Sequence, residues 1–291
     1  MVDPPAVAAP AADARAVALL QKARQLGVTS FDVAAAANPE RAERLIARAF
    51  PEPDPAMVAV IGRSVETLSR EHASEERPLA SAGLAAALAN SVDQSRRRLA
   101  PVPVGVVEWD PGTDEAPTLP NVETDLRAHP GVPKPLWALR LSSRDVVLPD
   151  VGHEVNLFSG PFSILEPELG SRFEASGALP TAFLIARDPF SEGRLDGTRF
   201  AARTALAGPT SPPVDVRHLH EEFDPVLQLR FLTAAHRRTL AQASLQFVLH
   251  WPWVVTAVVP LPEPERFEEV LAYGSTPPIS PDEFEQIRRL K

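Results

Sequence analysis

The chain has no cysteine and only one tyrosine, Tyr273, among its 291 residues. The lack of cysteine excludes disulfide bonds, a thiol nucleophile and thiolate ligands for a metal. Basic residues are also few: 29 against 38 acidic residues give a net charge of −9, and they are scattered along the chain. A surface that follows nucleic-acid phosphates is therefore not expected.

Long hydrophobic runs are missing as well. No apolar stretch reaches the ~18 residues of a membrane span. The N-terminus, MVDPPAVAAPAAD, lacks the basic and apolar segments of a secretory signal. We therefore expect a soluble, cytoplasmic protein. The sequence has no G-x-S-x-G or H-E-x-x-H motif, and His218 and His220 have no third ligand at a suitable spacing, so we expect no metal site.

Apolar segments that read as buried strands alternate with amphipathic helices along the chain. We predict strands at 28–32, 57–62, 102–109, 136–141, 153–157, 181–186 and 254–259. We predict helices at 12–26, 39–49, 78–99, 122–128, 165–176, 225–250, 264–271 and 281–290. Runs of Val, Ile, Leu and Ala between helices are typical of a parallel sheet with covered faces. Repeated βα units of this kind predict an α/β fold, a (β/α)8 TIM barrel, with a doubly wound open sheet as second choice.

The first strand of such a barrel is degenerate or missing. Residues 1–12 precede the first helix, and three prolines, at positions 4, 5 and 10, disfavour a central strand there. We expect a loose arm at 1–12, with the gap covered by the arm, by another copy in a homo-oligomer, or by a partner chain. No composition break divides the chain, so residues 1–291 should form a single domain. The irregular stretch 188–213 should be a long loop over the barrel mouth.

Four segments in this order resemble the aldo/keto reductase family. Phe31-Asp32-Val33-Ala34 is similar to the family's F-D-T-A after its second strand, and 241–249, AQASLQFVL, to its A-Q-x-A-L-x-x-x-L helix. The segment 257–260 with the helix 264–269 resembles its cofactor-binding V-I-P region. Residues 188–197 resemble its S-P-L-x-x-G-x-L-x-G run. The resemblance covers about residues 12–291 and implies a barrel that transfers hydride from NADPH to a carbonyl.

The catalytic residues of that family are largely replaced. The family uses Asp, Tyr, Lys and His, in which Tyr protonates the carbonyl oxygen and the Asp–Lys pair lowers its pKa. The resemblance assigns Asp32 to the Asp and Arg63 to the Lys, and places Glu108 at the His. The Tyr position is Ala37, which has no proton to donate. We therefore expect Asp32, Arg63 and Glu108 to be the catalytic candidates of a chain that has lost ordinary carbonyl reduction.

The cofactor features implied by the resemblance are also reduced. Ser142 and Ser143 stand at the family's Ser-Asn, which holds the nicotinamide amide, and Arg266 fits the Arg that binds the 2′-phosphate. Arg187 replaces the aromatic residue that stacks on the nicotinamide. The phosphate loop is short at 261–263, and it carries an acid and a proline where phosphate donors are needed. We therefore expect no NADPH binding, or weak binding only.

Charged and polar residues at the strand ends should still meet at the carboxyl-terminal mouth of the barrel. We expect Asp32 to pair with Arg63, and Arg187 to pair with Glu108 or Asp188, with these groups acting either as a structural salt-bridge network or as a ligand site. The substrate-binding candidates are Asn156, Arg187 and Asp188.

Three functions are open. The first is non-redox chemistry on, or binding of, a small polar or anionic molecule. The second is an NADPH-dependent oxidoreductase with Glu108 as proton donor. The third is a pseudoenzyme subunit or scaffold.

Overall fold

The computed structural model describes residues 9–72, 81–111, 135–141, 157–175, 182–200, 223–260 and 264–290. They belong to two compact units, Met1–Arg140 with Pro149–Leu157, and Leu141–Leu148 with Phe158–Lys291. The single domain expected for 1–291 stays a prediction. No helix among the described residues is long and apolar enough to cross a membrane.

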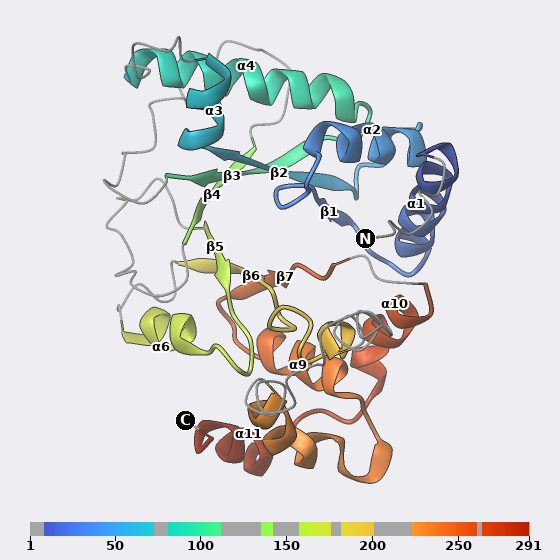
Figure 1. Ribbon diagram of the computed structural model, residues 1–291, viewed down its shortest axis with the longest axis vertical. Coiled ribbons are helices and arrows are strands. Elements are labelled where there is room, and N and C mark those ends of the chain that lie inside the picture. Colours follow the sequence, from blue (N-terminus) through green and yellow to red (C-terminus); the bar gives the residue numbers. More distant parts are fainter. Residues whose placement is uncertain are drawn as a thin grey trace, which may run out of the picture. The chain divides into compact units, whose positions relative to one another are not determined.

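The first unit is a parallel sheet with helices on one side. Its elements are α1 (Ala9–Gln25), β1 (Ser30–Asp32), α2 (Pro39–Ala49), β2 (Val58–Ser64), α3 (Val65–His72), α4 (Ser81–Leu99), β3 (Val104–Asp110) and β4 (Leu136–Arg140). The strands are hydrogen-bonded in chain order, β1-β2-β3-β4, and each pair is parallel. Figure 1 shows α2 and α4 on one side of β1–β3. This is the arrangement that the βα repeat predicts.

Side chains alternate between the two faces of the sheet along each strand of this unit, so every second residue faces the helices. Phe31 of β1 packs against Phe50 at the end of α2, with ring centroids 5.1 Å apart. Ile61 and Trp109 share this side, and both are buried. Successive strand residues point to opposite faces, so the residues between these positions, such as Asp32 and Glu108, point to the other face.

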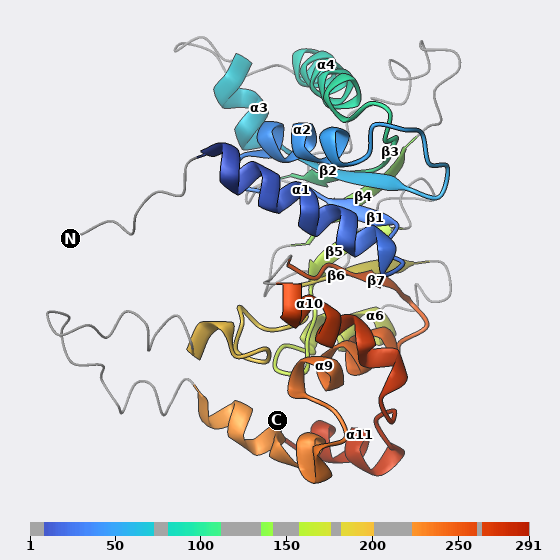
Figure 2. The ribbon, with the colours of Figure 1, turned by 90° about the vertical axis from the view of Figure 1, so that its right-hand side faces the viewer.

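The second unit has two clearly registered strands and a set of C-terminal helices. Its elements are β5 (Leu157–Pro161), α6 (Glu168–Ala175), β6 (Phe183–Arg187), η2 (Leu229–His236), α9 (Leu240–Leu249), β7 (Val254–Ala257), α10 (Pro264–Leu271), η3 (Ala272–Ser275) and α11 (Pro281–Arg288). Strand β6 pairs with β7 in parallel. Figure 2 shows α9 and α10 on the same side of these two strands. An aromatic core made by Phe162, Phe173 and Trp253, with centroid distances of 5.1 and 5.2 Å, supports this unit.

Three predicted elements differ from the structure. Helix α1 begins at Ala9, so residues 9–12 of the predicted arm are helical. The predicted helix 225–250 is interrupted, because a capping box of Thr239 and Gln242 starts α9 anew after η2. Strand β5 begins at Leu157 rather than ending there. The predicted helix 122–128 lies outside the described residues.

Candidate functional site

The strand register of the first unit places two predicted site residues on one face. Asp32 pairs with Val60, Gly62 pairs with Glu108, and Glu108 pairs with Ala138. Paired residues of neighbouring strands point the same way. Asp32 and Glu108 therefore share the face that is turned away from α2 and α4, near the carboxyl ends of the strands.

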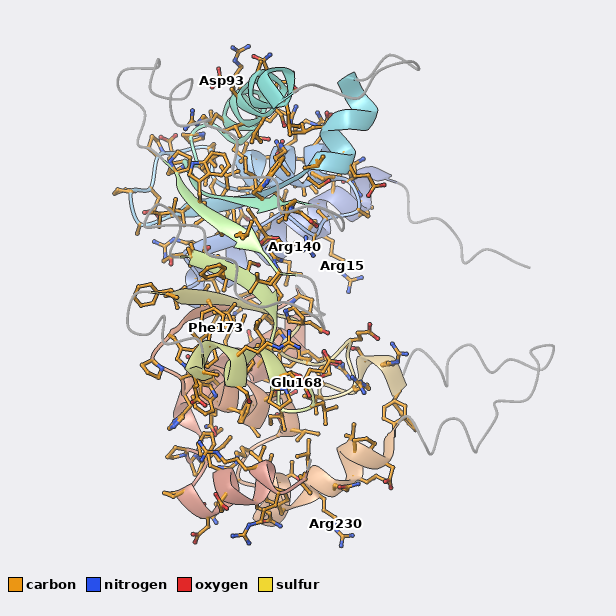
Figure 3. All side chains as sticks on the ribbon, turned by 90° about the vertical axis from the view of Figure 1, so that its left-hand side faces the viewer. Arg15, Asp93, Arg140, Glu168, Phe173 and Arg230 are labelled. Atoms are coloured by element: carbon orange, nitrogen blue, oxygen red, sulfur yellow. The ribbon has the colours of Figure 1, made fainter. Side chains whose placement is uncertain are left out.

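Arg140 joins this face from β4, and it is the residue that sequence reasoning missed. It lies two residues after Ala138, so alternation puts it on the face of Glu108. Its Nη1 lies 3.2 Å from Oε1 of Glu108, and its Nε lies 4.0 Å from Oδ2 of Asp110. Glu108 is 1% exposed, whereas the side chains of Arg140 and Asp110 are 36% and 43% exposed. Figure 3 labels Arg140 on its strand.

Asp32 is partly used by the chain itself. Its Oδ1 accepts a hydrogen bond of 2.8 Å from the backbone N–H of Ala34, which fixes the turn after β1. This turn packs tightly on β2, because a Cβ at Gly62 would lie 2.7 Å from Cβ of Ala34. Ala37, which stands where the resemblance expects the catalytic tyrosine, is exposed. Its methyl group offers no proton.

Arg63 lies on the opposite face, which contradicts its predicted pairing with Asp32. It pairs with Trp109 across β2 and β3, and its guanidinium reaches α4. There it donates hydrogen bonds to Oγ of Ser91 and Ser95, and it lies 3.9 Å from the buried carboxylate of Glu43. The reason is the length of β2, which continues to Ser64. Alternation along the strand therefore turns the side chain at position 63 toward the helices.

Glu43 is the centre of this helix-side network. It is fully buried, and it accepts hydrogen bonds from Oγ of Ser95 and from Nε of Arg98. A buried carboxylate is tolerated when it is paired and hydrogen-bonded in this way. We therefore assign Arg63 to the packing of α2 and α4 on the sheet.

The predicted site residues of the second unit lie at the end of β6. Arg187 is buried and donates a hydrogen bond of 2.7 Å from its Nε to Oγ of Ser159. Gly160 faces α6, since a Cβ there would lie 2.9 Å from Leu169. Ser159 and Arg187 therefore lie on the side of β5 and β6 that is turned away from α6. A pairing of Arg187 with Glu108 stays a prediction.

Asp188 is held in a strained turn rather than in a pair with Arg187. It has a φ of 50°, and Ser191 and Glu192 also have positive φ values of 49° and 55°. Both carboxylate oxygens of Asp188 accept the backbone N–H of Glu192 at 2.8 Å. Burial raises the pKa of Asp188, the Glu192 N–H opposes this, and the nearby carboxylate of Glu166 adds to the rise. Asp188 thus works first as a turn residue.

Part of the predicted site lies outside the described residues. Ser142, Ser143, the loop 261–263, His218 and His220 are among these. Asn156 also lies outside the described residues. Of the loop predicted at 188–213, residues 188–200 are described, and most of them form turns. Within the described part of the chain, no three metal-ligating side chains cluster together.

Arg266 is the described residue that best fits the phosphate of a nucleotide cofactor. It lies in the first turn of α10, and its Nη1 is buried without a hydrogen-bond partner in the structure. Gly197, with φ of +77°, lies beside it: a Cβ there would be in van der Waals contact with Nη2 of Arg266, at 3.9 Å. An orphaned guanidinium nitrogen at a helix N-terminus suits an anionic group.

Comparisons with known proteins identify the fold. No protein-family model and no curated protein sequence matches the chain. Among solved structures, an aldo-keto reductase from Bacillus halodurans in its holo form matches with a TM-score of 0.64 at 16% identity, over 96% of this chain and 87% of the other. A thermostable aldo-keto reductase bound to the inhibitor epalrestat matches with 0.65 at 17%, over 96% and 88%. An aldo/keto reductase from Klebsiella pneumoniae bound to NADP and acetate matches with 0.66 at 17%, over 96% and 86%.

This likeness shows the fold and not the activity. The chain has the α/β fold of the aldo-keto reductases, as predicted. Among the described residues the sheet has seven parallel strands, where a (β/α)8 barrel has eight. Seven strands in the described part of the chain are consistent with a barrel of this type that has a missing strand.

Proposed function

We propose that this chain is an aldo-keto-reductase-fold protein that has lost ordinary NADPH-dependent carbonyl reduction. In its place, we propose that it binds a small polar molecule, or acts on one without redox chemistry, at the face that carries Asp32, Glu108 and Arg140. The observation that carries the proposal is the position of Arg63. The residue that should assist proton transfer lies on the helix-facing side of β2, where Ser91 and Ser95 hold it.

The proton relay of a carbonyl reductase therefore lacks two parts. A reducing enzyme must give a proton to the carbonyl oxygen as hydride arrives at the carbon, and the donor must lie within hydrogen-bond reach of that oxygen. Ala37 supplies no donor. Arg63 cannot assist a proton donor on this face, because Glu43 and α4 hold its guanidinium on the other face.

The contact of Glu108 with Arg140 supports the view that Glu108 does not fill this gap. Its Oε1 lies 3.2 Å from Nη1 of Arg140, and a carboxylate that faces a guanidinium serves it as an acceptor rather than as a proton donor. Glu108 and Asp32 therefore act as acceptors on this face, and Arg140 acts as the donor. This mixture of both signs suits a polar ligand that carries hydrogen-bond donors as well as acceptors.

The proposal is tested by an assay of aldehyde reduction and a binding titration run together. Consumption of NADPH is followed with 4-nitrobenzaldehyde, beside an active aldo-keto reductase as positive control. We expect no turnover above that of a blank without protein. Turnover that disappears in Glu108→Gln would overturn the proposal, because it would show that Glu108 donates the proton after all.

A second candidate function is an NADPH-dependent oxidoreductase, favoured by the unpartnered Nη1 of Arg266. The related structures bound to NADP or NADPH come from proteins at 17% identity, so cofactor binding by this chain is a separate proposal. The bound cofactor would supply hydride, and Arg266 would hold its 2′-phosphate. Calorimetric titration with NADPH and NADH decides it. If this candidate is right, Arg266→Met removes a preference for NADPH, whereas Arg230→Met, a change in an exposed arginine of η2, leaves it intact.

A further inference from the structure

We infer that a groove between η2 and α11 binds a small amphiphilic molecule, an alkyl chain that ends in a carboxylate. The groove has a volume of about 500 Å³, which is within the range of small-molecule sites. Both walls belong to the second unit, so the inference is independent of the function proposed for the face of Asp32, Glu108 and Arg140. The residues that line the groove are Leu227, Gln228, Arg230, Phe231, Gln286 and Leu290.

Leucines on both walls of the groove are exposed to solvent. Leu227 is 57% exposed and Leu290 is 38% exposed. Among the described residues, six large hydrophobic side chains are exposed, and two of the six meet at this groove beside the half-buried Phe231. Apolar side chains that gather in a hollow with polar groups at its rim mark a binding surface. An alkyl chain that covers them is stabilised because apolar area leaves water.

The two walls are tied together by Arg238, so the groove is formed before a ligand arrives. The Nε of Arg238 donates to the carbonyl oxygen of Leu232 in η2 at 2.9 Å. Its Nη1 donates to the carbonyl oxygens of Pro277 and Pro278, both at 2.9 Å, and its Nη2 pairs with Glu283 of α11. A site that is ordered in advance loses less entropy when it binds a ligand.

The charge in the groove indicates an anionic group at one end of the ligand. Of the described residues that line the groove, only Arg230 is charged, and no ion pair of Arg230 is recorded in the described part of the chain. Its side chain is exposed, and Figure 3 labels it. A guanidinium can bind a carboxylate through two parallel hydrogen bonds. Apolar walls with one cation therefore complement an alkyl chain that carries a carboxylate.

The groove is too small for a helix or for a second copy of the chain. Gln286 and Leu290 cover one helical turn on one wall, and the residues from Leu227 to Phe231 cover one turn on the other. A bound amphipathic helix needs anchors over two turns, at i, i+3 or i+4, and i+7. A stable contact between two copies needs about 20–30 residues on each side. One turn on each wall fits a single alkyl chain instead.

The test titrates octanoate against the full chain by ligand-observed NMR, beside hexanoate, octan-1-ol and octyltrimethylammonium. We expect saturable binding of octanoate in the millimolar range. Hexanoate lacks two methylene groups and should bind about 3- to 10-fold more weakly. Octan-1-ol should bind about 2- to 5-fold more weakly, because it lacks an exposed ion pair. Octyltrimethylammonium should bind more weakly still, because its charge has the sign of Arg230.

Two variants locate the binding. Leu227→Ser removes an exposed apolar side chain and should weaken octanoate and octan-1-ol alike, by about 3- to 10-fold. Its matched control is Leu26→Ser, at a leucine of the first unit that is 40% exposed. Arg230→Met should weaken octanoate to the affinity of octan-1-ol and leave octan-1-ol unchanged. Its matched control is Arg237→Met, at an exposed arginine that caps the end of η2. Neither control should change binding.

Absence of saturable octanoate binding, or equal affinity of Leu227→Ser and wild type, would overturn the inference. Octan-1-ol that binds as tightly as octanoate would overturn the assignment of the carboxylate to Arg230. Light scattering and flotation with phosphatidylcholine vesicles examine the other occupants. A dimer or a vesicle-bound form that Leu227→Ser abolishes would assign the groove to a second copy or to a membrane, and not to a small amphiphile.

Discussion

Replacing Glu43 should destabilise the first unit strongly, although Glu43 takes no part in the proposed site. Its carboxylate is fully buried, accepts from Ser95 and Arg98, and lies 3.9 Å from Nη2 of Arg63. The side chain of Arg63 is 9% exposed, so Glu43→Ala removes a buried carboxylate that lies close to a nearly buried guanidinium. Breaking a buried pair on one side costs about 3–5 kcal/mol.

Two further variants separate charge from volume. Glu43→Gln keeps the shape of the side chain but turns an NH2 group toward one of its donors, and should cost at least about 2 kcal/mol. Glu40→Gln is the control on the same helix. Its side chain is 59% exposed and lies 3.6 Å from Nη1 of Arg98, so its loss should cost less than about 1 kcal/mol.

The measurement is urea unfolding followed by circular dichroism, with the midpoint and the slope both reported. Arg63→Met should also lower the midpoint. The double variant Glu43→Gln with Arg63→Met should lose less free energy of unfolding than the two single variants lose in sum, because the two residues act together. The outcome that refutes this reasoning is an Arg63→Met protein of unchanged stability that has lost ligand binding, since Arg63 would then belong to the site.

Three other changes test separate parts of the structure. Gly62→Ala puts a Cβ 2.7 Å from Cβ of Ala34 and should cost about 1–3 kcal/mol by urea unfolding. Asp188→Asn should stabilise the protein at neutral pH, because burial raises the pKa of Asp188 above its ordinary value of 3.8. The stability linked to this carboxyl is therefore complete below pH 3.8 and is lost as the pH rises through the raised pKa. In thermal melts below pH 3.8, the variant should be no more stable than the wild type. Burial acts to raise the pKa of Glu283, but the Ser280 N–H and Arg238 lower it below 4.5 on balance. Glu283→Gln should therefore destabilise the protein above pH 4.5. In thermal melts, the difference in stability between the variant and the wild type should shrink as the pH falls through the lowered pKa.

The sequence predicted strand positions in the first unit well, and side-chain direction only where the strand ends were correct. The sequence predicts Asp32 and Glu108 at strand ends, and the register puts both on one face. It predicts Arg63 after a strand that ends at 62, where a loop could turn the side chain toward Asp32. The strand continues to Ser64, and one residue of alternation sends a side chain to the opposite face.

The second half was less predictable because its motifs are short and its strands lack a strong pattern. Strand β5 lies four residues later than predicted, at Leu157–Pro161. Arg140 lies inside the strand predicted at 136–141, so the strand pattern alone does not single it out. A charged residue near the carboxyl end of a buried strand is a signal that could have identified it, because such a charge needs a partner or a ligand.

The position of Arg63 also predicts that two substitutions toward the residues implied by the resemblance do not give the chain carbonyl reductase activity. A variant with Ala37→Tyr and Arg63→Lys carries the side chains that the resemblance implies for proton transfer. Lysine at position 63 would still leave β2 on the side of α4, near Glu43, because the register of β2 and β3 sets its direction. We therefore expect the double variant to show no NADPH-dependent reduction of 4-nitrobenzaldehyde, together with a lower urea midpoint. Reduction by a folded double variant would mean that a side chain at position 63 reaches the face of Asp32, which is the opposite of what the hydrogen bonds to Ser91 and Ser95 indicate.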